Sequence, residues 1–143
     1  MKRTLLSTLV AAAVVATSAH AQISDGIVKI GVLNDMSGLY SDITGQGSVL
    51  AAKMAVEDYL KASGSKLKVE VVGADHQNKP DIGSNITRQW YDTDKVDMIA
   101  DVPTSSVGLA VAQISKEKGK LHVNSGSATA DRKSTRLNSS HRC

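Results

Sequence analysis

The sequence is poor in the residues from which covalent, nucleophilic and nucleic-acid-binding sites are built. Its single cysteine is Cys143, so we expect neither a disulfide nor a cysteine nucleophile in the fold. Phenylalanine is absent, and aromatic residues make up 3% of the chain. Because these few aromatics are not interleaved with basic residues, the composition argues against nucleic acid as a partner.

The common signatures of phosphate, dinucleotide and ester chemistry are also missing. The chain has no G-x-x-x-x-G-K-[ST] phosphate loop and no G-x-S-x-G nucleophile elbow. Gly45 and Gly47 lack the third glycine of a dinucleotide fingerprint. Ser37 and Ser125 could each be proposed as a nucleophile, but neither has an identifiable histidine or acidic partner. These absences argue against catalysis.

Metal binding has equally little support. His76 and His122 stand apart in the sequence, and the Asp75-His76 pair is better interpreted as part of a surface loop than as metal ligands. Three acidic residues are spaced loosely like calcium ligands, but the glycine and terminal glutamate of an EF-hand loop are missing. These three are Asp92, Asp94 and Asp97. We therefore expect no metal site.

The first 21 residues have the pattern of a secretory signal peptide. Lys2 and Arg3 form a basic start, and residues 5–16 are apolar apart from one serine and one threonine. An Ala-His-Ala cleavage pattern follows and places the cut after Ala21. The apolar stretch is too short to span a membrane, and no cysteine follows it to carry a lipid. A buried N-terminal helix is the alternative. We expect export to the periplasm, with no membrane insertion after cleavage.

The other end of the sequence has an unusual match. Residues 131–141 correspond, residue for residue, to the translation of a DNA string that resembles a common sequencing adapter. Since the segment has no apolar period and no helix cap, residues 131–143 are predicted to be a non-native tail. A natural basic tail is the alternative. Residues 22–130 remain as one α/β unit, which we expect to be an incomplete domain.

The basic charge of the chain resides in these two ends. The formal net charge is +3, from 17 basic and 14 acidic residues. Without residues 131–143 the counts are 13 and 13, and without Lys2 and Arg3 they become 11 and 13, a net charge of −2. The basic composition therefore gives no argument for nucleic acid or an anionic membrane as a partner.

Apolar periodicity predicts strands that alternate with helices. Short β-branched runs favour strands, and apolar residues at a spacing of 3.6 favour helices between them. The predicted strands are residues 27–33, 67–74, 96–100 and 120–123. The predicted helices are residues 45–62, one that begins at Pro80, and one that carries Val107 and stops at Gly119. The buried face of the first helix is predicted to consist of Val49, Ala52, Val56, Tyr59 and Leu60.

Strand–helix repeats of this length predict right-handed crossovers and parallel strands. We therefore predict an α/β fold, a three-layer sandwich with a parallel sheet whose post-strand loops all meet at one edge. These loops are rich in Ser, Thr, Asn, Asp and Gly, and nearly free of Lys and Arg. One cluster, Thr104-Ser105-Ser106, follows a strand and opens a helix. It could bind a carboxylate through free backbone N–H groups, or it could simply cap the helix.

Five segments, in order and without large gaps, together resemble the branched-chain amino acid type of ABC transporter solute-binding protein. They begin at Lys29, Ala55, Ala74, Val102 and Ser125, and read KIGVLNDMSGLY, AVED, ADHQNKPD, VPTSS and SGSAT. The resemblance implies the incomplete first lobe of a type I periplasmic-binding-protein fold, in which two α/β lobes close on a small-molecule ligand. It also implies delivery of the ligand to ABC permease membrane subunits, without catalysis, cofactor or metal.

The resemblance further implies where the ligand binds. In the family, the loops after the third and fourth strands hold the polar head of the ligand, and the loop after the first strand contacts its side chain. By matched position, the expected ligand-binding residues are Ser37, Tyr40, Pro103, Thr104, Ser105, Gly126, Ser127 and Thr129. Because fewer than half of the family's residues are present, we expect the chain alone not to bind.

Three functions remain open at this point. The favoured one is capture of an amino acid, an amide or a small or aromatic carboxylate for an ABC importer. The alternative is a ligand-sensing module of the same fold that acts on a receptor, which a fused or adjacent kinase in the full gene would favour. An exported α/β hydrolase is a distant third, and a G-x-S-x-G motif further along the gene would favour it.

Overall fold

The computed structural model describes Ile23 and residues 26–128 of the chain. The predicted signal peptide and the predicted tail lie outside the described residues. Strands and helices alternate along the chain as the periodicity predicts. Their bounds are β1 (Ile27–Asn34), α1 (Gly45–Ser63), β2 (Lys68–Asp75), α2 (Pro80–Asp92), β3 (Met98–Ala100), α3 (Ser105–Lys118) and β4 (Leu121–Val123).

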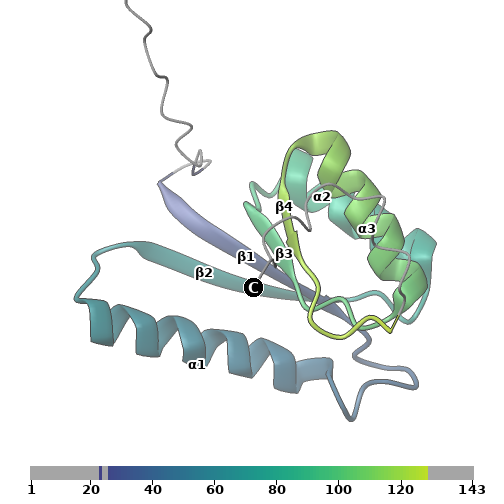
Figure 1. The fold of residues 1–143 in the computed structure, drawn as a ribbon, viewed down its shortest axis with the longest axis horizontal. Helices are drawn as coiled ribbons and strands as arrows, with labels where there is room; N and C mark the ends of the chain where they lie inside the picture. The colour runs from purple at the N-terminus through teal and green to yellow at the C-terminus, as the bar shows by residue number, and fades with distance from the viewer. Residues whose placement is uncertain (1–22, 24–25, 129–143) are drawn as a thin grey trace, which may run out of the picture.

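The four described strands form one parallel sheet in the order β2-β1-β3-β4. The first strand lies in the interior of the sheet, where Ile30 is paired with Val71 of β2 on one side and with Met98 of β3 on the other. Figure 1 shows β1 and β2 as long strands that run side by side, with the short β3 and β4 beyond them. The prediction of an α/β fold with a parallel sheet is confirmed.

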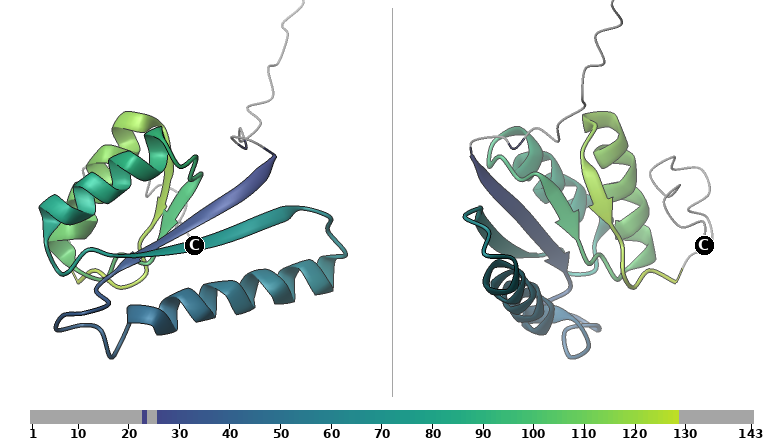
Figure 2. Two further views of the ribbon diagram at one scale, coloured as in Figure 1. Left: turned by 180° about the vertical axis from the view of Figure 1, so that it is seen from behind. Right: turned by 60° about the vertical axis from the view of Figure 1, so that its left-hand side comes forward.

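Helices cover both faces of the sheet, which gives three layers. The first helix lies against one face, and α2 and α3 lie side by side on the other (Figure 2). This arrangement follows from the strand order, because the chain moves one way from β1 to β2 and the opposite way from β2 to β3 and β4. Right-handed crossovers in opposite directions place their helices on opposite faces.

The main core lies between the sheet and the pair α2 and α3. Leu33 of β1 and Ile99 of β3 are completely buried there. From the helices, the core takes Trp90, Tyr91, Val107, Val111 and Ile114, all buried. Val107, Val111 and Ile114 recur every three or four residues along α3, and Trp90 follows half-buried Ile86 by four residues along α2, so each helix presents an apolar stripe to the sheet.

The opposite layer, α1, is packed more lightly. Only Gly45 and Val49 of this helix are buried. Tyr59 was predicted on the buried face, but its side chain is 59% exposed. The prediction was wrong because half-buried Val56 and Leu60 define the inward stripe, and Tyr59 is displaced from Leu60 by about 100° around the helix.

The ends of the helices follow their local sequence. Gly64 and Gly119 end α1 and α3 in the left-handed conformation, with φ of 64° and 63°, as predicted. Pro80 occupies the first turn of α2, also as predicted. The third strand begins later than predicted, at Met98 instead of residue 96. The reason is that the backbone N–H of Val96 turns back to donate to the carbonyl of Trp90, at 3.0 Å.

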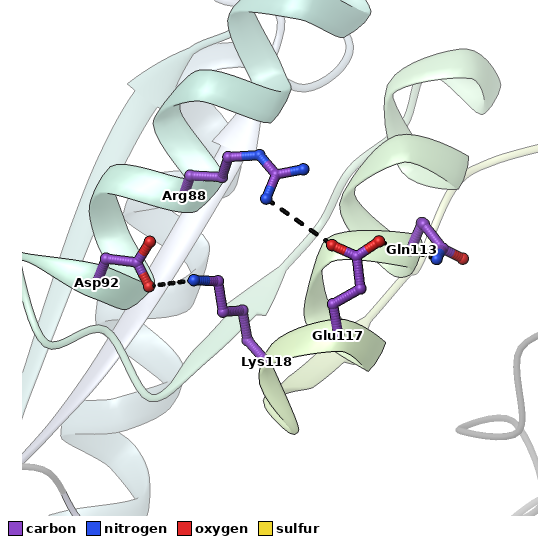
Figure 3. A network of polar contacts seen from close by, with 5 residues as sticks. All are labelled: Arg88, Asp92, Gln113, Glu117 and Lys118. Atoms are coloured by element: carbon purple, nitrogen blue, oxygen red, sulfur yellow. Dashed lines mark hydrogen bonds and ion pairs between the residues drawn. The ribbon is translucent and has the colours of Figure 1, made fainter.

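The outer surfaces of α2 and α3 are joined by ion pairs (Figure 3). Lys118 Nζ lies 2.6 Å from Asp92 Oδ1, and Arg88 Nη1 lies 3.8 Å from Glu117 Oε2. All four side chains are substantially solvent-accessible, so these pairs contribute little compared with the apolar core beneath them. Within the part of the chain that the structure describes, no helix is long and apolar enough to span a membrane.

Candidate functional site

Because the strands are parallel, the loops that follow them all emerge at one edge of the sheet (Figure 1). Asp75, the last residue of β2, joins the first two loops there. Its Oδ1 accepts hydrogen bonds from the backbone N–H of Met36, at 3.0 Å, and of Gln77, at 2.7 Å. Its Oδ2 accepts the hydroxyl of Ser37, at 2.5 Å. The loop after β1 is therefore fixed to the end of β2.

A second carboxylate shapes the loop after β1 from within. Asp35 is completely buried, and it accepts the backbone N–H groups of Gly38, at 2.9 Å, and Tyr40, at 3.0 Å. A Cβ on Gly38 would lie 2.6 Å from Asp35 Oδ2, so only glycine fits at this position. The predicted ligand residues Ser37 and Tyr40 are thus held by two aspartates, with the Ser37 side chain exposed and Tyr40 half-buried.

Asp101 follows β3 and links the neighbouring strand ends. Its backbone N–H donates to the carbonyl of Val123, at 3.1 Å. Its carboxylate accepts Asn34 Nδ2 at 3.4 Å and also the hydroxyl of Ser125. Its φ of 57° lies in the left-handed region, which non-glycine residues seldom adopt. Asp101 thus contacts the ends of both strands that flank β3.

The loop after β3 leads directly into α3. Thr104 is the N-cap residue and has extended backbone angles, but its side chain makes no capping hydrogen bond. Thr104 Oγ1 is buried and has no hydrogen-bond partner among the described residues. The first N–H groups of an α-helix have no partner within the helix, and Ser105 provides the first of them in α3. The predicted residues Pro103, Thr104 and Ser105 therefore lie at a helix N-terminus, where the hydroxyl of Thr104 is unsatisfied.

The loop after β4 packs against this same turn. The hydroxyl of Ser127 donates to the carbonyl of Val102, at 2.7 Å, and its backbone N–H donates to Asn124 Oδ1, at 2.9 Å. A Cβ on Gly126 would lie 3.6 Å from Pro103, so the two loops touch. The side chain of Ser127 is buried and its donors are engaged within the protein, so it anchors the loop. Thr129 lies outside the described residues.

His76 has a structural role that the sequence did not reveal. The sequence favoured a surface loop for the Asp75-His76 pair, but His76 is completely buried, which corrects that expectation. It lies beside α2, where a Cβ on Gly83 would be 3.6 Å from His76 Cβ. Its Nδ1 accepts the backbone N–H of Asn78, at 3.0 Å. The imidazole therefore holds a loop that contains two consecutive left-handed residues, Gln77 and Asn78.

Two side chains of this loop have shifted pKa values. Burial lowers the pKa of His76 below its ordinary value of 6.5, although the nearby carboxylates of Asp35 and Asp75 oppose that effect. Desolvation raises the pKa of Asp75, but the hydrogen bonds from Ser37, Met36 and Gln77 outweigh it and leave this pKa below 3.8. His76 is therefore neutral and Asp75 ionised at neutral pH. No group of three or more metal-ligating side chains occurs among the described residues.

The model of the family described as periplasmic binding protein matches residues 27–139, which is most of the chain. The chain belongs to the periplasmic binding protein family. A search of curated proteins gives no significant match. Because the family is one of binding proteins, the prediction that the chain is not an enzyme is confirmed at the level of the family.

Solved structures of the family share this fold. A periplasmic binding protein from Burkholderia mallei is 43% identical, with a TM-score of 0.68 over 75% of this chain and 28% of its own. A branched-chain amino acid ABC transporter periplasmic ligand-binding protein from Burkholderia xenovorans is 41% identical, with a TM-score of 0.66 over 71% of this chain and 27% of its own. These matches confirm the resemblance stated above.

A leucine-binding protein, LivK, from Thermotoga maritima is more distant. It is 25% identical, with a TM-score of 0.59 over 72% of this chain and 29% of its own. The chain thus spans less than a third of the length of each of these three relatives. The four-stranded sheet corresponds to part of the periplasmic binding protein fold, as expected for an incomplete lobe.

Proposed function

We propose that the chain is the first part of a longer protein, below called the full-length protein, which is the periplasmic solute-binding component of an ABC importer. It captures a small solute, a branched-chain or other amino acid, an amide, or a small or aromatic carboxylate. It then delivers this solute to the membrane subunits of the permease. Residues 1–21 direct it to the periplasm and are removed there.

The observation that carries this proposal is the buried, unpartnered hydroxyl of Thr104 at the N-terminus of α3. A buried polar atom without a partner is costly, and a bound acceptor group would satisfy it. The N–H groups of the first helical turn, which begins at Ser105, have no partner within the helix, and the helix dipole favours a negative charge there. A carboxylate or amide oxygen of the solute therefore fits this position.

The other predicted residues have distinct roles in this arrangement. Pro103 and Gly126 bring the loops after β3 and β4 into contact, and Ser127 anchors the second loop to Val102. Ser37 and Tyr40 lie on the loop after β1, where they would contact the rest of the solute. Thr129, by its matched position, completes the contacts to the polar head. The names of the relatives from B. xenovorans and T. maritima support a branched-chain amino acid as one candidate solute.

The test uses the full-length protein with a panel of leucine, asparagine, propionamide and benzoate. Isothermal calorimetry should detect binding of at least one of these compounds. Thr104→Val removes the hydroxyl at nearly constant volume, and should weaken binding by about tenfold, because a hydrogen bond to a charged group is worth about 1.5 kcal/mol. The control is Thr93→Val, at an exposed position just beyond α2.

Two results would contradict the proposal. One is the absence of binding across the panel, and the other is unchanged affinity in Thr104→Val. The 143-residue chain by itself should give no measurable heat with any of these compounds, because the part of the family's site contributed by a second lobe is missing from it. Tight binding by the chain alone would show that this half-site suffices.

A further inference from the structure

Asp101, which follows β3, is hydrogen-bonded toward the ends of both neighbouring strands, β1 and β4. This residue comes directly after the three-residue strand β3, which lies between β1 and β4. Toward β1, its Oδ2 accepts Asn34 Nδ2 at 3.4 Å. Toward β4, its backbone N–H donates to Val123 and its Oδ1 accepts the hydroxyl of Ser125. Asp101 therefore links the loops that follow three neighbouring strands.

This link lies at the point where the direction of the chain changes. The chain leaves β1 toward α1 on one face of the sheet, and it leaves β3 toward α3 on the other face (Figure 2). In open α/β sheets, ligands bind beside such a reversal, outside the carboxyl ends of the strands. The carboxylate of Asp101 spans the two strands that diverge here, β1 and β3, through its bond to Asn34.

We propose that Asp101 is a positioning residue, which fixes the spacing between the loops after β3 and β4 so that both can hold the polar head of the solute. This inference rests on the function proposed above. Thr104 and Ser105 follow Asp101 by only a few residues, and Ser127 follows its partner Ser125. A hydrogen bond between Asp101 and Ser125 therefore joins the two loops just before each reaches the proposed site.

The chemistry of the position favours an aspartate. Both neighbouring side chains donate, Asn34 through its amide nitrogen and Ser125 through its hydroxyl. A carboxylate accepts both bonds, whereas an asparagine side chain has one oxygen and could accept only with that. Glycine would fit the φ of 57° without strain but would make neither contact. An aspartate here accepts an unfavourable backbone conformation and gains two links between loops.

This difference between aspartate and glycine gives the test, which is made on the full-length protein. Asp101→Gly relieves the backbone strain, so the melting temperature should change by only a few degrees. The affinity for the panel compound that binds the wild type best should nevertheless fall about tenfold, because the head-binding loops lose their common support. In Asp101→Asn, the affinity for the same compound should fall only about threefold, since one acceptor oxygen remains. Asp58→Asn, on the exposed face of α1, is the control for loss of a negative charge.

A double-mutant cycle identifies the route through which Asp101 acts. Ser125→Ala should weaken binding in the same direction, and adding it to Asp101→Gly should cause little further loss, because both changes break one link. Hydrogen exchange provides a readout without a solute. In Asp101→Gly, the amides of residues 104–107 and 125–128 should exchange faster, while those of α1 should be unchanged.

The outcomes separate this inference from the proposed function. If the wild type binds nothing in the panel, the proposed function fails and the inference fails with it. If the wild type binds and Asp101→Gly binds equally well, with unchanged exchange in the two loops, the inference alone is overturned. If Asp101→Gly does not fold, Asp101→Asn is measured instead, and affinity and loop exchange equal to those of the wild type would overturn the inference. Fully additive effects of Asp101→Gly and Ser125→Ala would also overturn it.

Discussion

Gly31 of β1 lies directly beneath the indole ring of Trp90 of α2. A Cβ placed on Gly31 would be 2.4 Å from Cζ3 and 2.6 Å from Cε3 of that ring, which is too close for any side chain. Trp90 is buried and belongs to the main core. The glycine in the middle of the central strand is therefore required by packing, since it makes room for the only tryptophan of the chain.

This contact predicts the effect of a single methyl group. Gly31→Ala should lower the free energy of unfolding of the full-length protein by about 1–3 kcal/mol, because the ring must move and the core is overpacked. Thermal unfolding followed by circular dichroism measures the change. Gly47→Ala is the matched control, because nothing lies within 4 Å of its Cβ position in α1. It should stabilise by about 0.5–1 kcal/mol. Equal effects of the two substitutions would disprove the packing argument.

Gly108 predicts a second effect, on the loop after β4. A Cβ on Gly108 would lie 2.7 Å from Asn124 Nδ2 and 2.7 Å from Ser127 Oγ. Gly108→Ala should displace that loop from α3 and weaken solute binding by about tenfold. This loss of binding free energy should exceed the loss in the free energy of unfolding. Leu109→Ala, at the neighbouring exposed position, is the control. Calorimetry of both variants is the measurement, and normal affinity in Gly108→Ala would mean that the loop is not part of the site.

His76 predicts how stability depends on mildly acidic pH. Because the folded protein holds the pKa of His76 below its unfolded value of 6.5, the unfolded chain binds the proton more readily. The stabilisation is complete above pH 6.5 and is lost as the pH falls through the folded pKa. Protonation at Nδ1 would also remove the acceptor of the Asn78 N–H. The free energy of unfolding should therefore decrease as the pH is lowered below 6.5.

The variant His76→Asn separates this effect from other titrations. An asparagine side chain can accept the same N–H two residues further on but does not titrate, so the slope between pH 6.5 and pH 5 should become shallower. Asp75 does not interfere, because its lowered pKa confines its contribution to below about pH 4. Denaturant titrations at a series of pH values measure the slope. An unchanged slope in the variant would show that His76 is not the group responsible.

The burial of Tyr91 predicts how the stability of the fold depends on alkaline pH. Burial raises its pKa to about 12, although the hydrogen bond with Ser115, at 2.9 Å, opposes that shift. Its hydroxyl also donates to the carbonyl of Leu121, at 3.2 Å, and so joins α2 to β4. Because the folded pKa is raised above the unfolded value of 10, this stabilisation is complete below pH 10 and is lost as the pH rises toward 12.

Tyr91→Phe tests the role of that hydroxyl. The variant should be less stable at pH 7 by about 1 kcal/mol, the usual net value of one hydrogen bond, and its stability should fall less between pH 10 and pH 12. Absorbance at alkaline pH should show one fewer late-titrating phenol. Tyr59→Phe, on the exposed face of α1, provides the control. Identical alkaline behaviour of wild type and Tyr91→Phe would contradict the assignment.

Much of this fold could be predicted from local patterns. Apolar periodicity located every described helix and strand, and Gly64, Pro80 and Gly119 marked three of the helix ends correctly. Periodicity reports the spacing of apolar residues along the chain but not which strands are neighbours. The position of β1 between β2 and β3 was therefore not available from it. Tyr59 fell outside the buried stripe for a similar reason, since its spacing alone did not reveal how little of α1 the sheet covers.

The candidate site was less predictable than the fold. The matched segments identified the loops, but they did not reveal that Asp35, Asp75 and Asp101 hold these loops in place. Each of these contacts joins backbone or side-chain groups whose proximity depends on the folded turn or sheet. The burial of His76 was missed because it depends on the fold, in which α2 lies beside it: a Cβ on Gly83 would be 3.6 Å from His76 Cβ. The left-handed φ of Asp101 could not be predicted from the residues next to it in the sequence.

The placement of β1 between two later strands has a consequence for the order in which the sheet can form. The segment made first cannot complete its pairing until Met98 has been synthesised, because that residue pairs with Ile30. Long-range parallel pairing of this kind forms slowly. The edge of β1 that faces β3 therefore stays unpaired while the residues between them are synthesised, even though the opposite edge can already pair with β2. The strand order thus makes completion of the sheet a late step in the formation of this fold.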